Sequence, residues 1–368
     1  MKKLKKLFVL VAVALFPLTM SAQDENFYIF LCIGQSNMAG KGEIEAIDRA
    51  VPDNFLSLSA VNGKGRKLGQ WRKAVPPNSR DDAGLSVVDY FGRTMIDNLP
   101  EGARVGIIQV AVDGAGIDLF DKTNYRRYIS TVTESWKKKQ IDQLGGNPYA
   151  RLIELARKAQ DEGDIRGIII HQGETDAYDK QWIAKVKKIY NDIIHDLDLD
   201  IRTPLVVGEV GGADQAGQCA RANIIINQLP KGFQQCHVAS SKGCSLQSDR
   251  LHFDSDGYRT LGRRFGMKML QALGFEFHDY KSEVVAAPYQ PTIDVNASID
   301  TQGLIMAQAT EPLRRVDILN KSGYILKTMH FDGTRNVVIN TREFPAESYL
   351  KMIFLGMNGA TVELEMTP

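Results

Sequence analysis

Residues 27–40 read Phe27-Tyr28-Ile29-Phe30-Leu31-Cys32-Ile33-Gly34-Gln35-Ser36-Asn37-Met38-Ala39-Gly40. The first seven residues are apolar, aromatic or β-branched, which predicts a buried strand, and the glycine that follows ends it. Ser36 therefore comes directly after a strand. Ligands of α/β proteins bind outside the carboxyl ends of the strands, so Ser36 is a candidate functional residue. The alternative is an ordinary turn in which Ser36 bonds only to the backbone.

Strands and helices alternate along residues 23–280. Further strands are predicted at residues 104–112, 165–170, 204–210 and 236–240, and helices at residues 84–99, 148–159, 181–197, 218–229 and 255–273. Successive strands joined by helices form a parallel sheet with right-handed crossovers. We therefore expect an α/β domain in three layers, with a parallel sheet in flavodoxin-like strand order.

Two regions do not follow this alternation. Residues 41–80 have little periodicity and include Trp71, so they predict a long loop over the sheet edge, and long loops are often functional. From residue 284 the pattern changes again, because Pro288 and Pro291 indicate a linker and short alternating runs replace helices. Residues 285–368 predict a small antiparallel β-sandwich without a cluster of catalytic residue types.

The N-terminus has the layout of a signal peptide. Four lysines precede the apolar run at residues 7–18, and the small residues Ser21 and Ala22 follow it. We expect cleavage after Ala22 and a secreted or periplasmic protein. The apolar run is short for a membrane span, and no later segment is a candidate, so no membrane association is expected after cleavage.

The composition is that of a soluble globular protein. Of its 368 residues 43% are apolar and 24% are charged, with a formal net charge of +1. This length allows one large domain and a smaller one. No basic stripe indicates nucleic acid binding, and the oligomeric state stays open.

Export makes the four cysteines relevant. Cys32 lies in the first predicted strand, where a small buried hydrophobic residue is the expected role. Cys219, Cys236 and Cys244 remain. One disulfide among them, first of all Cys236 with Cys244, is an alternative that the sequence leaves open.

Polar residues follow the predicted strands at the same edge of the sheet. Ser36 follows the first strand, Gly114 the second and Gln172 the third, and Asp249 and His252 follow the fifth. A serine hydroxyl needs a base to become a nucleophile, and an imidazole held by a carboxylate is such a base. With two residues between them, Asp249 can reach one ring nitrogen of His252 while the other faces Ser36. The amides of Ser36 and Gly114 and the side chain of Gln172 would then donate to the oxyanion.

Other chemistries find little support. Position 38 is methionine, so the nucleophile elbow of α/β-hydrolases is absent, as are phosphate loops and dinucleotide fingerprints. His171, Glu174 and Asp176 are metal-ligand types, but a His and a Glu two residues apart in a loop form a weak metal motif. We expect them to form hydrogen bonds in the crevice walls, and we expect no metal and no cofactor.

Three blocks of the sequence resemble a known family. They are Gly-Gln-Ser-Asn-Met at 34–38, His-Gln-Gly-Glu at 171–174 and Asp-Arg-Leu-His-Phe at 249–253. In this order they resemble the SGNH-type carbohydrate esterases, and more narrowly the sialate O-acetylesterase-like group that includes family 6 acetylxylan esterases. The resemblance covers roughly residues 27–275. It implies that Ser36 is the nucleophile, that Asp249 and His252 complete the triad, and that Gln172 helps to form the oxyanion hole.

One block departs from the family pattern. Two glycines followed by Thr or Ser are usual there, whereas this chain has Asp113-Gly114-Ala115-Gly116. Gly114 keeps the required backbone position, and Asp113 adds a charge near the crevice. Candidate substrate-binding residues are Gln35, Asn37, Glu174, Trp71 and Asp113.

The sequence thus predicts a secreted serine esterase that removes O-acetyl groups from carbohydrate. Acetylated xylan or its oligosaccharides are the leading substrates. A sialate O-acetylesterase of the same fold is the nearest alternative, and a non-catalytic carbohydrate-binding protein is a more distant one. The C-terminal region resembles, less specifically, the sorting domains of some exported bacterial proteins, and a generic accessory sandwich is an equal alternative.

Overall fold

The computed structural model describes residues 24–277, 293–344, 349–357 and 360–367. The chain divides into two compact units, residues 1–279 and 280–368, which are treated separately here. The predicted signal peptide and the linker prolines Pro288 and Pro291 lie outside the described residues. Within the described ranges, no helix combines the length and the apolar character that crossing a membrane requires.

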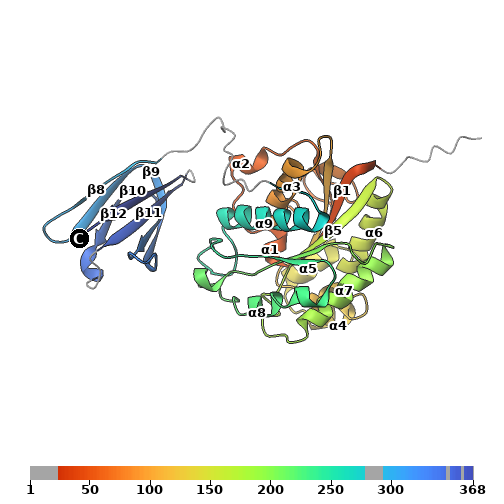
Figure 1. The fold of residues 1–368 in the computed structure, drawn as a ribbon. Coiled ribbons are helices and arrows are strands. Elements are labelled where there is room, and N and C mark those ends of the chain that lie inside the picture. The colour runs from red at the N-terminus through yellow and green to blue at the C-terminus, as the bar shows by residue number, and fades with distance from the viewer. Residues whose placement is uncertain (1–23, 278–292, 345–348, 358–359, 368) are drawn as a thin grey trace, which may run out of the picture. The chain divides into compact units, whose positions relative to one another are not determined.

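A seven-stranded sheet forms the centre of the first unit (Figure 1), in the order β3-β2-β4-β1-β5-β6-β7. Its strands are β1 (Asp24–Gly34), β2 (Phe55–Leu58), β3 (Trp71–Lys73), β4 (Arg104–Ala111), β5 (Gly163–His171), β6 (Leu205–Gly208) and β7 (Cys236–Ala239). All neighbours are parallel except β2 and β3. The five strands expected from the sequence are present, and β4-β1-β5-β6-β7 is the predicted flavodoxin-like order.

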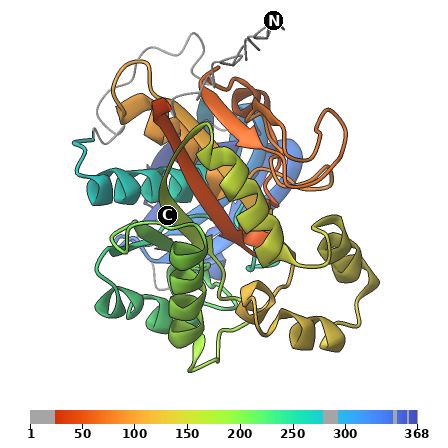
Figure 2. The same cartoon turned by 90° about the vertical axis from the view of Figure 1, so that its right-hand side faces the viewer.

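Helices cover both faces of this sheet (Figures 1 and 2). Residues of α3 (Val87–Asn98) and α9 (Ser255–Leu273) share one apolar cluster with Phe30 and Cys32 of β1. Residues of α6 (Pro148–Gln160) and α7 (Trp182–Asp196) share the other with Leu31. Alternate side chains of β1 therefore enter opposite layers, which explains why residues 27–33 of the strand are apolar.

The helix ends follow from local capping. Asn147 accepts a hydrogen bond from the N–H of Ala150 over 3.1 Å, and Pro148 begins α6. Asp254 caps α9 in the same way through the N–H of Gly257, at 2.9 Å. The first unit also contains α1 (Ser36–Ala39), α2 (Ala46–Arg49), η1 (Ile117–Phe120), α4 (Tyr125–Thr131), α5 (Ser135–Gln143), η2 (Ala213–Gln215), α8 (Ala222–Ile226) and η3 (Leu229–Gly232).

Two sequence-based expectations need correction. Residues 41–80 are not one long loop, because β2 pairs with β4 and β3 pairs with β2, extending the sheet. These strands have only four and three residues, too few for an alternating pattern to be recognised. The helix expected at 218–229 is reduced to α8, where Asn223 bonds through its side chain to both backbone groups of Val210.

All four cysteines are free thiols, so the alternative of a disulfide is not realised. Cys236 and Cys244 could not pair without rearrangement, because they belong to the apolar clusters on opposite faces of the sheet. Cys32 is fully buried, as predicted.

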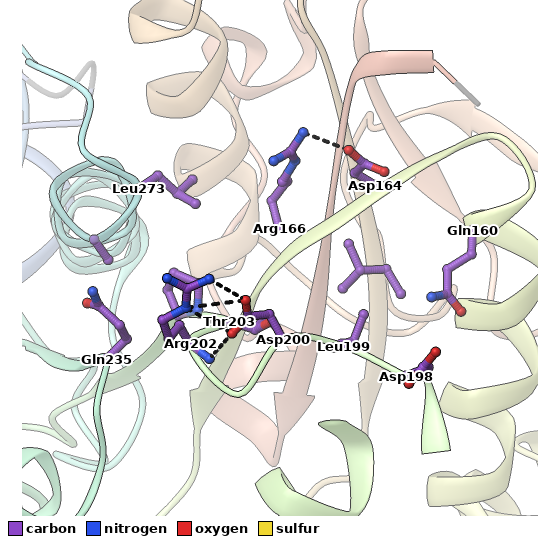
Figure 3. A pocket seen from close by; sticks show the side chains of 13 residues that line it. Gln160, Asp164, Arg166, Asp198, Leu199, Asp200, Arg202, Thr203, Gln235 and Leu273 are labelled. Atoms are coloured by element: carbon purple, nitrogen blue, oxygen red, sulfur yellow. Dashed lines mark hydrogen bonds and ion pairs between the residues drawn. The ribbon is translucent and has the colours of Figure 1, made fainter. Parts of the chain in front are cut away.

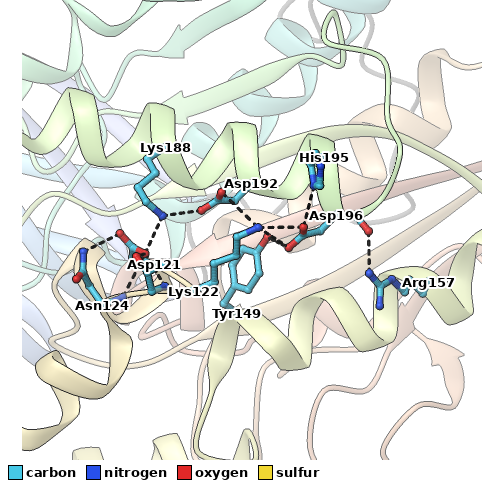
Figure 4. Close-up of polar contacts among 10 residues, drawn as sticks. Asp121, Lys122, Asn124, Tyr149, Arg157, Lys188, Asp192, His195 and Asp196 are labelled. Carbon is cyan, nitrogen blue, oxygen red and sulfur yellow. Dashed lines mark hydrogen bonds and ion pairs between the residues drawn. The ribbon is translucent and has the colours of Figure 1, made fainter.

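A polar network fixes the segment after η1 against α6 and α7 (Figure 4). Asp121, which is 2% exposed, accepts hydrogen bonds from Thr123 and from the Lys188 ammonium group. Lys122 donates to Asp196, which also accepts from the hydroxyl of Tyr149. The loop that leaves the carboxyl end of β4 is thereby anchored to both helices.

The second unit contains β8 (Val295–Ile299), β9 (Leu304–Leu319), β10 (Ile325–Asn340), η4 (Thr341–Glu343), β11 (Leu350–Gly356) and β12 (Thr361–Met366). The five strands are antiparallel, as the sequence predicts, whereas the predicted sandwich is not confirmed. Their hydrogen bonds connect them in one sheet, in which β8 and β11 pair with successive halves of β9. The unit has its own apolar core, which includes Ile318 and Phe354.

Candidate active site

Strand β1 carries Ser36 to the carboxyl end of the sheet. Gly34 pairs with Ala111 of β4 and with His171 of β5, and the N–H of Gln35 donates to the carbonyl oxygen of His171 over 3.2 Å. A side chain at position 34 would collide with that carbonyl group, which explains the glycine. Ser36 is the first residue of α1 and is 4% exposed. The serine is therefore held on a short, tightly packed turn.

Ser36, His252 and Asp249 form a hydrogen-bonded chain. The hydroxyl oxygen of Ser36 lies 2.9 Å from Nε2 of His252, and Nδ1 of His252 lies 2.6 Å from Oδ2 of Asp249. The fold brings this histidine to a serine 216 positions earlier in the sequence. This is the arrangement that the strand-end pattern and the Asp-x-x-His spacing predict.

The surroundings of Asp249 favour its ionised form. Its second oxygen accepts the N–H groups of Leu251 and His252 at 2.9 and 3.0 Å. Partial burial acts to raise the pKa of Asp249, but the N–H groups of His252 and Leu251 and the imidazole outweigh it and hold the pKa below its ordinary value. A carboxylate at Nδ1 places the ring proton there and leaves Nε2 as the proton acceptor toward Ser36.

Asn37 joins the serine turn to the histidine loop. Its side-chain amide donates to the carbonyl oxygen of Leu251 over 3.0 Å, and its oxygen accepts from the N–H of Phe253 over 3.3 Å. The same amide donates to Glu174 at 2.5 Å, and the hydroxyl of Tyr258 donates to the oxygen at 2.6 Å. The two peptides that flank His252 are thus attached to the residue after Ser36.

Two backbone donors remain available beside Ser36. Within residues 24–277 the backbone N–H groups of Ser36 and Gly114 donate to no protein acceptor. Ser36 is the first residue of a helix, where an N–H has no intrahelical partner. Gly114 has φ 59°, a left-handed conformation that glycine adopts at little cost. The two predicted oxyanion donors therefore have free hydrogen-bonding capacity.

Gln172 is oriented differently from the expectation. It is fully buried, and its amide nitrogen donates to Oε1 of Gln35 and to the carbonyl oxygen of Ala115, both at 3.2 Å, and to Asp176. The indole N–H of Trp182 donates to its oxygen over 2.5 Å. Both amide hydrogens are thus occupied by protein acceptors. The amide links the residue before Ser36 to the residue after Gly114 instead of facing a substrate.

Three candidate substrate-binding residues are also part of this internal framework. Gln35, Asn37 and Glu174 are at most 7% exposed, and their side chains bond to protein groups. One oxygen of Glu174 accepts from Asn37, and the other is buried without a hydrogen-bond partner among the described residues. Because these side chains are buried and bond to protein groups, they hold the active-site segments together. The structure does not favour the direct substrate contacts that the sequence predicts for them.

The remaining two candidates need correction as well. The charge of Asp113 is neutralised, because its carboxylate accepts from Lys41 at 2.7 Å and from Arg80 at 2.5 Å. Burial acts to raise its pKa, but Arg80 and Lys41 outweigh burial and lower it. Trp71 lies at the opposite end of β1, where it packs on Phe27 with ring centroids 4.9 Å apart. Trp71 is thus a packing residue of β3, and the prediction that it lies in a functional loop and binds substrate is wrong.

The three residues considered as metal ligands have separate partners. Nε2 of His171 bonds to the carbonyl oxygen of Glu209 at 3.0 Å, while Glu174 and Asp176 bond to Asn37 and to Gln172. Burial lowers the pKa of His171. Among the described residues no group of three such side chains converges.

Several supporting residues were missed at the sequence level. The indole N–H of Trp182 donates to the oxygen of the Gln172 amide, and the hydroxyl of Tyr258 donates to Asn37. Asp176, for which such a hydrogen bond is predicted, accepts from the nitrogen of the same amide. No short motif contains all of these residues, so only the fold could reveal them.

A second hollow lies at the other end of the sheet (Figure 3). Its charged side chains pair locally, Arg166 with Asp164 and Arg202 with Asp200, each at 2.6 Å. No serine, cysteine or histidine lines it. The residues that line this hollow therefore include no counterpart of Ser36 or His252.

The chain is similar to known carbohydrate esterases. A family model described as carbohydrate esterase, sialic acid-specific acetylesterase, matches residues 26–271. The probable carbohydrate esterase At4g34215 of Arabidopsis thaliana is 22% identical over 253 residues, which are 64% of this chain and 86% of that protein.

Solved structures show the same fold. The structure of the Arabidopsis thaliana protein matches with a TM-score of 0.53 and 19% identity, covering 67% of this chain and 99% of the other. The crystal structure of NanS matches with a TM-score of 0.50 and 14% identity, covering 68% and 99%. The family match extends over more than half of the chain and confirms the resemblance seen in the three blocks. The chain therefore belongs to the carbohydrate esterase, sialic acid-specific acetylesterase family, and it is a carbohydrate acetylesterase.

Proposed function

We propose that this chain is a secreted or periplasmic serine esterase that removes O-acetyl groups from carbohydrate through a covalent acetyl-enzyme on Ser36. The observation that carries the proposal is the distance of 2.9 Å between the hydroxyl oxygen of Ser36 and Nε2 of His252, whose other nitrogen is held by Asp249. A non-catalytic carbohydrate-binding protein would have no use for this alignment.

In the first step Ser36 attacks the acetyl carbonyl carbon while His252 takes the hydroxyl proton at Nε2. Asp249 stabilises the imidazolium that forms. The carbonyl oxygen becomes an oxyanion and accepts the free N–H groups of Ser36 and Gly114, each worth roughly 3 kcal/mol in the transition state. His252 then returns its proton to the sugar oxygen, the C–O bond breaks, and the deacetylated sugar leaves.

In the second step water attacks the acetyl-enzyme. His252 accepts a proton from the water, the same two N–H groups bind the second oxyanion, and the proton passes to Ser36 as acetate departs. These residues complete the cycle without a metal or a cofactor. Gln172 fixes the N–H groups of Ser36 and Gly114 relative to each other, because its amide bonds to both Gln35 and Ala115, the neighbouring residues.

Acetylated xylan or its oligosaccharides are the substrates that we propose first. The family description favours a second candidate, an O-acetylated sialic acid. The basic and apolar N-terminal sequence supports export, and we propose that the C-terminal unit, as a sandwich-like accessory or sorting domain, acts outside catalysis.

Acetate release from acetylated xylo-oligosaccharides and from O-acetylated sialic acid, compared at equal concentration, tests the substrate. A serine-directed phosphonate should label Ser36, and Ser36→Ala should be folded and inactive. Full activity of Ser36→Ala, or labelling of a different serine, would contradict the mechanism. Activity that is lost in EDTA and restored by a divalent ion would contradict the metal-free cycle.

A further inference from the structure

Trp136 is an exposed aromatic residue at the edge of the site. It lies on α5 and is 47% exposed, whereas Trp182 is buried and Trp71 lies at the other end of β1. A Cβ atom on Gly114 would lie 3.4 Å from Cη2 of Trp136. The indole edge therefore borders the turn that carries one of the two free N–H donors.

Helix α5 is fixed to this turn by Gln140. Its side-chain oxygen accepts the N–H of Asp113 over 2.9 Å, and its nitrogen donates to the Asp113 carboxylate over 3.0 Å. Trp136 and Gln140 are four residues apart and so lie on the same helix face. The position of the indole relative to Gly114 is thus set by two hydrogen bonds from the preceding residue.

The charged groups closest to the indole and to the Gly114 turn are paired. The ammonium group of Lys137 lies 5.4 Å from the ring centroid of Trp136 and pairs with Glu134 at 3.1 Å. Asp113 pairs with Lys41 and Arg80, and Arg80 also pairs with Asp82. Lys138 and Lys139, the following residues of α5, are exposed on the same helix. The aromatic face of Trp136 is therefore bordered by paired groups toward Gly114 and by exposed lysines along α5.

We infer that Trp136 is the platform on which the pyranose ring of the substrate stacks. The inference rests on the proposed function and names a residue that binds its substrate. A large exposed aromatic surface beside a site is typical of a binding surface. The apolar C–H face of a neutral sugar matches an indole, while its hydroxyl groups stay in water. An acetyl group whose carbonyl oxygen binds Gly114 leaves its sugar ring within reach of Trp136.

The test compares two substrates. One is an acetylated xylo-oligosaccharide, and the other is ethyl acetate, which has no ring to stack. Trp136→Ala should lower kcat/KM for the oligosaccharide at least about tenfold more than kcat/KM for ethyl acetate. Trp136→Phe should restore most of the difference. Tyr178, 76% exposed on the loop after β5, provides the matched control, because Tyr178→Ala should leave the ratio unchanged. An unchanged ratio in Trp136→Ala, or a loss caused by Tyr178→Ala instead, would overturn the inference.

Binding to inactive protein separates this inference from the esterase proposal. Calorimetry should show at least about tenfold weaker binding of the oligosaccharide to Ser36→Ala/Trp136→Ala than to Ser36→Ala. Equal binding of the oligosaccharide to the two variants, or no detectable binding to either, would overturn the inference that Trp136 is the stacking platform. Failure of the esterase proposal would appear separately, as absence of acetate release by the wild type.

Discussion

The side-chain amide of Asn37 donates a hydrogen bond to the carbonyl oxygen of Leu251 over 3.0 Å, so the residue after the serine holds the peptide that precedes His252. The N–H of Phe253 bonds to the same side chain from the other side of the histidine. Asn37 is fully buried and touches no solvent. The position of the imidazole over Ser36 therefore depends on a residue that is outside the triad.

Asn37→Ala should lower kcat about 10- to 100-fold with little change in KM, because a displacement of His252 by a fraction of an ångström weakens proton transfer. Tyr258→Phe is the matched control, since it removes one bond to Asn37 and leaves both peptide contacts intact. The rates to measure are acetate release and phosphonate labelling of Ser36. A normal labelling rate in a destabilised Asn37→Ala protein would show that Asn37 supports the fold alone.

Gln172→Ala should cost stability as well as turnover. The substitution leaves the indole N–H of Trp182 without its acceptor, and a buried unsatisfied group costs about 1–3 kcal/mol. A residue that only donates to the oxyanion would lower kcat and leave the free energy of unfolding unchanged. Urea denaturation and kcat, measured on the same variant, distinguish the two roles.

A paired substitution sharpens this test. Gln172→Glu places a carboxylate oxygen against Asp176, whose pKa burial already raises. Adding Asp176→Asn returns a donor to that contact and should recover part of the lost stability. If the double variant were no more stable than Gln172→Glu, the contact between Gln172 and Asp176 would not be what stabilises the site.

The sequence predicted the parts of the site that depend on local spacing. Ser36 follows an apolar run, and Asp249 and His252 are close enough in sequence to pair, so their positions could be inferred without coordinates. The direction of the Gln172 amide could not be inferred from the sequence. It depends on hydrogen bonds to four groups that the fold brings around this buried side chain. The short strand β3 could not be predicted for a similar reason. Its pairing with β2, and not the pattern of its own residues, makes it a strand.

Acid should weaken the anchor of the loop after η1 (Figure 4). Burial acts to raise the pKa of Asp121, but Thr123 and Lys188 outweigh it and lower the pKa to about 2. A carboxyl group whose pKa is lowered in the folded state stabilises the fold above its ordinary pKa, and this contribution is lost as the pH falls toward about 2. The shift corresponds to about 2 kcal/mol at neutral pH.

Asp121→Asn should therefore reduce the free energy of unfolding by about 2 kcal/mol at pH 7, and the difference from wild type should shrink between about pH 4 and pH 2. Asp53→Asn is the control, because the carboxylate of Asp53 is 95% exposed beside Lys73 and its removal should leave stability unchanged. Urea denaturation over a series of pH values measures both. A difference that is constant with pH would rule out the ionised carboxylate as the source of the stability.

A chain that ends at Asp279 should fold and keep the kcat of the full chain for ethyl acetate within about twofold. All the site residues lie between Gly34 and Tyr258, and each unit has its own apolar core. Ending the chain at Gly262 provides the contrasting control, because it removes Phe265 and other fully buried residues of α9 and should prevent folding. A folded but inactive 1–279 chain would mean that the second unit contributes to catalysis. Normal hydrolysis of ethyl acetate with weaker hydrolysis of polymeric acetylated xylan would instead assign carbohydrate binding to residues 280–368.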